Sequence, residues 1–587
     1  VQTLAEMLRS RGFATGAAVS SFLLRPETGI AQGFGFYDAD RPESGGDAGP
    51  VTRSALATVD AAEAWIRTQD DRRFFLFLQV GEAEADLAVT RLMALLKDRR
   101  VYDGSTIMLL ADRGEDPAQT LDDSSLRVPF IVKQPENEGA GRRVGLPVQQ
   151  IDIAPTLLDL VRAPVPDNLT GRSLRDVLTD DKATLRDRPL YAEWLAPQLA
   201  FGGYPVRAIT TASYRYVRGV EEELTPLAPS QEGPGTAAET ARLRAELDRL
   251  IAAAPPVLPS SVAPADEELL ALHGYLAPPP FTIAPPPLRA PDQAGLIHQH
   301  RAAALLIGQK KYSAGIRALQ SIVDAHPELL VVQYQLGSAL VRAGRLDEAI
   351  AVLQGARDRV PDQPDLALAL ADALMRAGRI ELAGRQVDDA LALAKPSDPS
   401  SRAAAHELAA RIALARNDPE EATAQGKAAR EADPESPIEG FVRGRILYNE
   451  AKYEEAAAAF QEAVSDAGKR KRSIPELHLY LGESLAHLDR YVEAEAQYRE
   501  ELRTFPRSVQ VYSRLAMLYA ATNRQEAVED VLNELVAATP TPESYAVAAR
   551  LWTIVGNPTR AEALRSDARD RFRGDPSLAL LGKGGRR

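Results

Sequence analysis

Two hydrophobic patterns divide the chain into an α/β part and an all-helical part. Before about residue 255, short apolar runs such as residues 74–80 and 106–111 alternate with amphipathic stretches such as residues 58–68 and 86–99. Short apolar runs bounded by turn residues predict strands that are buried on both faces, and the amphipathic stretches predict helices that cover them. We therefore expect an α/β domain over residues 1–255.

After a stretch dense in proline, the pattern changes to alanine-rich helix with a repeat of about 34 residues. A small residue marks the first helix of each unit, and a second small position follows twelve residues later in nearly every unit. The first-helix anchors are Ala303, Gly337, Ala371, Ala410, Gly444, Gly482, Ala516 and Ala549. Small residues at these positions let paired helices approach closely. The signature resembles tetratricopeptide repeats, and we expect a solenoid of about eight repeats over residues 296–576. A proline-rich linker over residues 256–295 with one short helix would precede it, and a tail over residues 577–587 would follow.

The carboxyl end of the apolar run at residues 106–111 carries the candidate chemistry. Open α/β sheets build their ligand sites at such strand ends, and Asp112 follows this run directly. Three segments resemble the sulfatase branch of the alkaline-phosphatase-like hydrolases. They are Asp112-Arg113-Gly114-Glu115, the segment Leu-Arg-Val-Pro at residues 126–129, and the Asp-Ile-x-Pro-Thr motif that starts at Asp152. The resemblance implies a sulfatase-like α/β fold and makes Asp112 the relic of a family metal ligand.

The same resemblance identifies where this chain departs from the family. The family has histidine or asparagine as a second ligand, whereas this chain has Arg113, and a guanidinium cannot be deprotonated to bind a cation. The histidine-containing loops of the family are short in this chain, and all seven histidines lie at or after His273. The family's nucleophile segment has no counterpart in residues 1–255. We therefore expect no catalytic residue and no cofactor in this part. For Asp122 and Asp123 we expect a turn role rather than metal ligation.

The amino-acid composition limits the classes of partner and of binding site that the chain can have. A formal net charge of -13 argues against a nucleic-acid binder, which would carry a basic surface. The absence of cysteine excludes disulfides and thiolate metal sites. No apolar run approaches the roughly 18–20 residues of a membrane span. The sequence leaves the compartment open, and the family resemblance is compatible with a bacterial protein that is periplasmic, extracytoplasmic or membrane-associated.

Two functional hypotheses follow. The first is an interaction scaffold in which a degenerate, inactive sulfatase-like domain is joined to repeats that bind a protein or peptide. Tetratricopeptide repeats use the concave face formed by their first helices, where Tyr334, Tyr448, Tyr480 and Tyr512 are the candidate partner-binding residues. The alternative is a metal-dependent sulfatase or phospho-transfer hydrolase whose nucleophile segment lies before Val1 and whose repeats serve targeting. That alternative requires calcium or another divalent cation.

Overall fold

The structure is a computed structural model of the 587-residue chain. It describes residues 2–40, 53–70, 72–81, 83–115, 120–180, 182–185, 188–201, 203–227, 236–253, 270–272, 274–276, 293–394, 399–469, 473–573 and 578. Most of the expected linker at residues 256–295 and of the expected tail at residues 577–587 lies outside the described residues.

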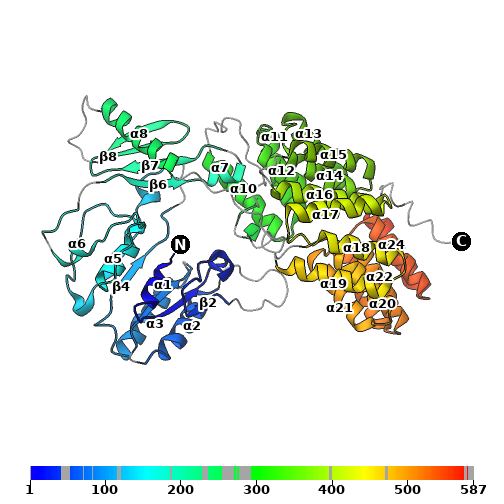
Figure 1. The fold of residues 1–587 in the computed structure, drawn as a ribbon, viewed down its shortest axis with the longest axis horizontal. Helices are drawn as coiled ribbons and strands as arrows, with labels where there is room; N and C mark the ends of the chain where they lie inside the picture. Colours follow the sequence, from blue (N-terminus) through cyan, green and yellow to red (C-terminus); the bar gives the residue numbers. More distant parts are fainter. Residues whose placement is uncertain are drawn as a thin grey trace. The chain divides into compact units, whose positions relative to one another are not determined.

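The N-terminal part contains a parallel sheet with helices packed against it (Figure 1). Its strands are β1 Ala14–Val19, β2 Phe36–Asp38 and β3 Phe74–Gln79, in the order β2-β1-β3. Its helices are α1 Leu4–Arg9, α2 Ala55–Arg67 and α3 Ala85–Asp98. The apolar faces of α2 and α3 meet at Trp65 and Leu95, as their amphipathic sequences predict.

The next two strands differ from the expectation in their burial. Strand β4, Ile107–Leu110, pairs antiparallel with β5, Phe130–Lys133, in a separate two-stranded sheet. Leu110 is 38% exposed and Ile131 is 60% exposed. The prediction of a strand is confirmed, but the prediction that it is buried on both faces is wrong. An apolar run indicates that a strand is suited to burial, whereas the burial itself depends on which neighbours cover it.

A third sheet of four antiparallel strands, in the order β6-β7-β8-β9, completes the α/β part. These strands are β6 Leu190–Trp194, β7 Val206–Thr210, β8 Tyr214–Arg218 and β9 Glu222–Pro226. Helix α8, Thr236–Ala253, lies on β7 and β8 and buries Leu243 and Leu247 against Ile209 and Tyr216 (Figure 1). The connecting helices are α4 Asp123–Leu126, α5 Ile153–Leu160, α6 Arg175–Thr179 and α7 Ala196–Phe201.

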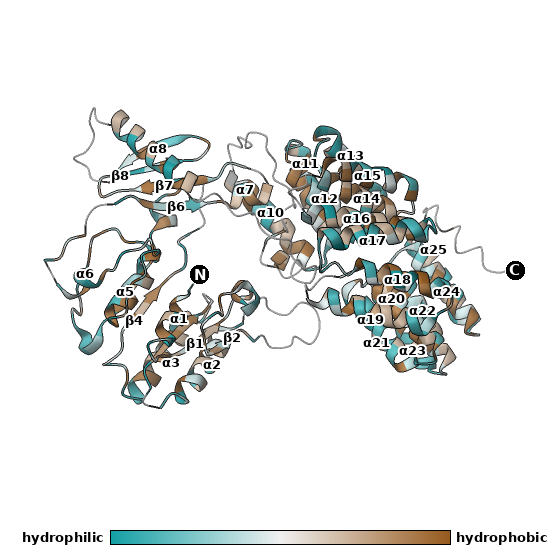
Figure 2. Ribbon diagram, in the orientation of Figure 1, coloured by the Kyte–Doolittle hydropathy of each residue, from teal (hydrophilic) through white to brown (hydrophobic). Residues whose placement is uncertain are grey.

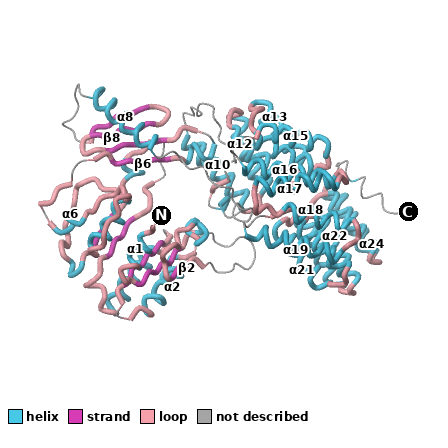
Figure 3. Tube along the Cα trace, viewed as in Figure 1, coloured by secondary structure: helices cyan, strands magenta, loops and turns pink. Residues whose placement is uncertain are grey.

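The described residues from 293 onward form helices joined by short loops (Figure 3). The helices are α10 Gln293–Gly308, α11 Tyr312–Ala325, α12 Leu330–Arg342, α13 Leu346–Arg359, α14 Pro364–Arg376, α15 Ile380–Leu393, α16 Pro399–Ala415, α17 Pro419–Ala432, α18 Ile438–Asn449, α19 Tyr453–Lys469, α20 Leu477–His487, α21 Tyr491–Thr504, α22 Val509–Ala521, α23 Gln525–Ala538, α24 Pro542–Ile554 and α25 Pro558–Arg571. This arrangement confirms the expected helical solenoid.

The anchor residues lie where the helices of a pair approach each other. A Cβ atom on Gly337 would come within 2.6 Å of the Leu353 side chain, and one on Gly482 within 2.7 Å of the Tyr498 ring. Buried apolar residues from Ala410 to Ala561 form one core cluster. Figure 2 shows apolar residues recurring along the helices of the solenoid. The close approach therefore requires the small residues that the repeat pattern identified.

The described residues divide into two compact units, one made of those up to Val332 and the other of those from Gln333 onward. Helices α10 and α11 belong to the first unit, in which α10 contacts α7. The division therefore falls later than the boundary expected near residue 296, because contacts rather than sequence composition define it. The expected domain limits stay a prediction.

Candidate functional site

The segment after β4 is held by backbone contacts, while the side chains of Asp112 and Arg113 are exposed. The Gln150 Nε2 atom donates to the carbonyl oxygen of Ala111 at 3.0 Å and to that of Asp112 at 2.8 Å. Two residues further on, a Cβ atom on Gly114 would lie 2.4 Å from the Ser124 carbonyl oxygen. The glycine therefore lets this loop pass beneath the start of α4.

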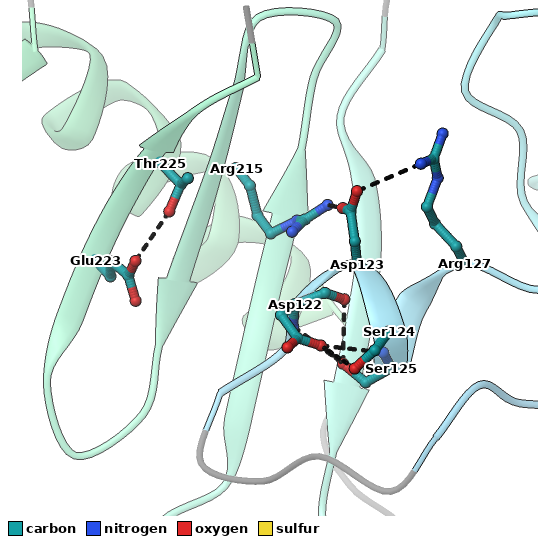
Figure 4. Close-up of polar contacts among 8 residues, drawn as sticks. All are labelled: Asp122, Asp123, Ser124, Ser125, Arg127, Arg215, Glu223 and Thr225. Atoms are coloured by element: carbon teal, nitrogen blue, oxygen red, sulfur yellow. Dashed lines mark hydrogen bonds and ion pairs between the residues drawn. The ribbon is translucent and has the colours of Figure 1, made fainter.

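Asp122 and Asp123 form polar contacts at the start of α4 (Figure 4). The Oδ1 atom of Asp122 accepts hydrogen bonds from the Ser124 hydroxyl at 2.8 Å and from the Ser125 backbone N–H at 3.1 Å. The hydroxyl contact, and then the backbone one, hold the pKa of Asp122 below its ordinary value. Asp123 forms ion pairs with Arg215 of β8 and, at 3.5 Å, with Arg127. These contacts agree with the expected turn role.

Asp152 is the fully buried carboxylate of the sulfatase-like motif. Its oxygens accept from the backbone N–H of Gln149 at 3.0 Å and of Arg172 at 2.9 Å, and its charge is paired with Arg188. It does not cap α5 with its side chain, because these three donors occupy it. The motif therefore joins three chain segments structurally.

A divalent cation such as calcium takes about six to eight oxygen ligands. Within the described residues, no group of three or more histidine, cysteine, aspartate or glutamate side chains lies close enough to share a cation. Asp112 supplies one carboxylate and is followed by the cationic Arg113. The described donor set around Asp112 therefore does not fit a divalent cation.

A second candidate site lies on the first helices of successive repeats, where α14, α16, α18, α20 and α22 contact one another in that order. Charged and aromatic side chains link these helices, and we call this group the first-helix wall. It consists of Asp372, Arg411, Arg445, Tyr448, Tyr480 and Glu483.

Ion pairs and hydrogen bonds connect the wall from one helix to the next. Arg411 Nη1 of α16 lies 3.8 Å from Asp372 Oδ1 of α14. Tyr448 of α18 donates its hydroxyl proton to Glu483 of α20, and the same carboxylate pairs with Arg514 of α22. These contacts link α14 to α16, and they link α18 to α20 and α22.

The four tyrosines predicted to bind a partner lie in different surroundings. Tyr448 and Tyr480 are half-buried, with ring centroids 5.4 Å apart, and burial is the main cause that raises both pKa values. Tyr334 is half-buried, and desolvation raises the pKa of its hydroxyl to about 12. Tyr512 is only 5% exposed in the helix core and donates to the Pro506 carbonyl at 3.2 Å. A buried ring with an occupied hydroxyl does not present a contact surface, so Tyr512 differs from the expectation.

The charged members of the wall were not among the residues predicted from the sequence, although the sequence carries a signal for them. Asp372, Arg411, Arg445 and Glu483 each follow an anchor residue directly, at Ala371, Ala410, Gly444 and Gly482. Since the anchor faces the paired helix, the next position on each first helix is rotated by about 100° and recurs on the same side of successive repeats. A charge therefore recurs at that position in four successive units, and the sequence shows this recurrence.

Comparisons with known proteins find matching families for both the α/β part and the helical part of the chain. Residues 118–232 match the family model described as N-sulphoglucosamine sulphohydrolase, C-terminal. A tetratricopeptide-repeat model matches residues 300–364, 334–399, 368–437 and 441–509. The expected sulfatase-like domain and the expected repeats are thus confirmed.

Two curated relatives are sulfatases by description. The chain is 36% identical over 103 residues to the ulvan-active sulfatase of Formosa agariphila, a match that covers 17% of this chain and 20% of that protein. It is 31% identical over 119 residues to arylsulfatase K of Gallus gallus, covering 19% of this chain and 22% of that protein. The chain therefore spans about a fifth of the length of these relatives.

Among solved structures, a putative sulfatase from Bacteroides thetaiotaomicron is similar with a TM-score of 0.34 and 16% identity. The match covers 43% of this chain and 74% of that one. None of the helices in the described part of the chain has the length and apolar character needed to cross a lipid bilayer.

Proposed function

We propose that this chain, which joins a sulfatase-like domain to tetratricopeptide repeats, is an interaction scaffold whose repeats capture a polypeptide partner. The observation that carries this proposal is the first-helix wall. Polar and aromatic groups lie on successive first helices there, and the stacked repeats of a solenoid form extended concave surfaces that such proteins use for binding. Tyr334, Tyr448 and Tyr480 supply amphipathic surface of the kind that interfaces favour.

In this proposal the sulfatase-like domain is a catalytically inactive structural module. Its motif residues support that role, because Asp152 joins chain segments and Asp123 joins α4 to β8. Metal-assisted displacement needs a cation that stabilises both the attacking and the leaving oxygen. The second ligand position of the family is occupied in this chain by Arg113.

A pull-down tests the scaffold role. We expect the full chain and residues 296–576 to retain the same partner, and residues 1–255 to retain none. Partner binding that needs only residues 1–255 would contradict the proposal. An assay with aryl sulfates and aryl phosphates on each protein should give no turnover above the background rate.

The second candidate function is a sulfate-ester hydrolase that obtains its missing catalytic groups from outside residues 1–587. The observation that favours it is the 36% identity to a protein described as an ulvan-active sulfatase. In that case Asp112 binds a divalent cation together with those additional groups. Elemental analysis of the purified protein and of an Asp112→Asn variant separates the two candidates. Stoichiometric calcium that is lost in the variant would favour the hydrolase.

A further inference from the structure

We propose that a cavity at the amino end of the parallel sheet binds a small organic anion, with the oxyanion on Arg9 and Arg72 and the apolar part of the ligand on Trp65. We call it the amino-end cavity. Its volume is about 520 Å³, within the range of ~300–1,000 Å³ that is usual for small-molecule sites. The inference goes beyond the scaffold role and does not depend on it. Three features carry it: the position of the cavity, its unpaired guanidinium groups and its aromatic wall.

The amino-end cavity lies where the strands of the β2-β1-β3 sheet begin. Ala14 is the first residue of β1, Gly35 directly precedes β2, and Arg72 comes two residues before β3. All three residues line the cavity. The position of Asp112 follows the carboxyl end of β4, which belongs to another sheet. The cavity is therefore a separate site from the strand end that resembles the sulfatases.

Close packing around β1 forms the inner wall of the cavity. A Cβ atom on Gly16 would come within 2.6 Å of the Trp65 ring, so the indole packs directly on the backbone of the strand. Thr15 also lines the cavity, and its hydrogen bonds are made inside the protein. Its hydroxyl donates to the Gly33 carbonyl oxygen at 2.9 Å and accepts from the Gly35 N–H at 3.0 Å. The protein's own contacts therefore hold the inner wall, and a ligand does not have to break them.

The two arginines that line the cavity have no acidic partner. Arg9 and Arg72 are exposed, and neither side chain forms a hydrogen bond or an ion pair with a described residue. In the same unit, Arg53 and Arg91 do pair with carboxylates. A guanidinium can donate two parallel N–H bonds to one oxyanion. Two such groups beside one cavity therefore favour an anionic ligand.

The carboxyl end of α1 gives a second reason for a cation at Arg9, which lies in the last turn of that helix. The partial negative charge at a helix end amounts to about half an elementary charge. It does not neutralise Arg9 and Arg72 together with Arg11 and Arg73, which lie close to them in the chain and outside any helix. Arg73 is held by the Phe13 ring, whose centroid lies 4.7 Å from its guanidinium carbon. The helix end therefore leaves net positive charge on these guanidinium groups.

Phe13 and Trp65 give the cavity an apolar wall. Trp65 is only 9% exposed, and its ring centroid lies 5.8 Å from that of Phe36 and 5.9 Å from that of Phe74. Its indole N–H donates to no described residue, although a buried indole N–H usually has a hydrogen-bond partner. An oxygen atom of the ligand would supply that partner. The wall and the guanidinium groups together therefore suit an anion that carries a ring.

An NMR titration of the full chain tests this proposal. The three tryptophans give three indole N–H signals, which Trp194→Phe and Trp552→Phe assign. The probes are benzoate, benzenesulfonate and phenylphosphonate, which share one ring and differ in the oxyanion. We expect at least one of them to shift the Trp65 signal and not the other two, and the tightest of the three identifies the oxyanion. Benzyl alcohol and benzylamine lack the anion and should bind at least about tenfold more weakly.

Substitutions of the arginines test the oxyanion site. Arg9→Met and Arg72→Met should each weaken binding about tenfold, the loss expected for a hydrogen bond to a charged group. Arg11→Met is the matched control, because it removes the same charge near the same strand end from a residue that does not line the cavity. It should change the dissociation constant less than about twofold at about 0.15 M salt, where charges are screened over ~8 Å. All three side chains are exposed, so the variants should keep the thermal unfolding of the parent.

Three results would overturn the proposal: no shift of the Trp65 signal with any of the three anions, equally tight binding of benzylamine, or an affinity of Arg11→Met equal to that of both cavity variants. Inorganic phosphate that bound as tightly as phenylphosphonate would overturn the assignment of an organic anion. The scaffold role is tested separately by the pull-down and stands or fails independently of these results.

Discussion

We expect Glu501 to make the stability of the solenoid depend on pH in a direction opposite to that of an ordinary surface carboxylate. This residue of α21 is 2% exposed, and its carboxylate accepts from the backbone N–H of Glu476 at 2.7 Å and of His478 at 3.1 Å. It thus caps the start of α20 from a neighbouring helix. Desolvation is the main cause that raises the pKa of Glu501 from 4.5 to about 7, and the nearby Glu476 adds to it.

The sign of this pH dependence follows from the difference in bound protons between the folded and the unfolded state. Between pH 4.5 and pH 7 the folded state keeps a proton on Glu501 that the unfolded chain has lost. The free energy of unfolding therefore falls as pH rises through this interval, by ~1.4 kcal/mol per pH unit, or about 3 kcal/mol in total. Above pH 7 and below pH 4.5 this residue contributes no further slope.

Glu501→Gln should remove this slope. Glutamine cannot present two oxygens to the two N–H groups, so the variant should be less stable than the parent by ~1–3 kcal/mol at low pH, where the parent is most stable. The difference between the two proteins is therefore largest near pH ~5 and small near pH ~8. Hydrogen–deuterium exchange of the first amides of α20, corrected for intrinsic rates, measures it.

Two control substitutions separate the effect of the Glu501 carboxylate from the effects of its neighbours. An imidazole can also change charge in this pH range, so the comparison is made in a His478→Gln background. Glu500→Gln alters the adjacent, partly exposed residue, whose pKa is lowered by its hydrogen bond to Arg503, and it should leave the slope in place. A Glu501→Gln protein with the slope of its parent would refute the reasoning.

Further variants test the packing. Gly482→Leu should destabilise its repeat by ~1–3 kcal/mol or more through overpacking, with loss of exchange protection confined to neighbouring repeats. Gly355→Ala changes an open position of α13 and should instead stabilise the folded protein by about 0.5–1 kcal/mol. If Gly482→Leu and Gly355→Ala had equal effects on thermal unfolding, the inferred helix pairing would be contradicted. Arg188→Ala leaves the buried Asp152 carboxylate without its charge partner and should cost about 3 kcal/mol in urea unfolding. Arg218→Ala, which breaks a more exposed pair, should cost less than about 1 kcal/mol, and similar losses would show that Asp152 is not a structural centre.

Local periodicity determined the elements of this protein. The amphipathic pattern predicted α2 and α3 to within a few residues, and the expected small anchors lie at the helix contacts, as at Gly337 and Gly482. A helix or strand pattern is carried by residues close in the chain, and a repeat multiplies the same signal. Both can therefore be recognised without knowledge of the neighbours that an element meets.

The tertiary structure decided which side chains are buried and which residues they contact. The run at residues 107–110 has the composition of a buried strand, yet Leu110 is exposed because β4 pairs only with β5 in the described residues. Tyr448 and Tyr512 come from the same repeat pattern, yet one joins the wall and the other joins the core. The pairing of Tyr448 with Glu483 and the capping of α20 by Glu501 depend on how successive helices are rotated and spaced, which a single helix's sequence does not specify.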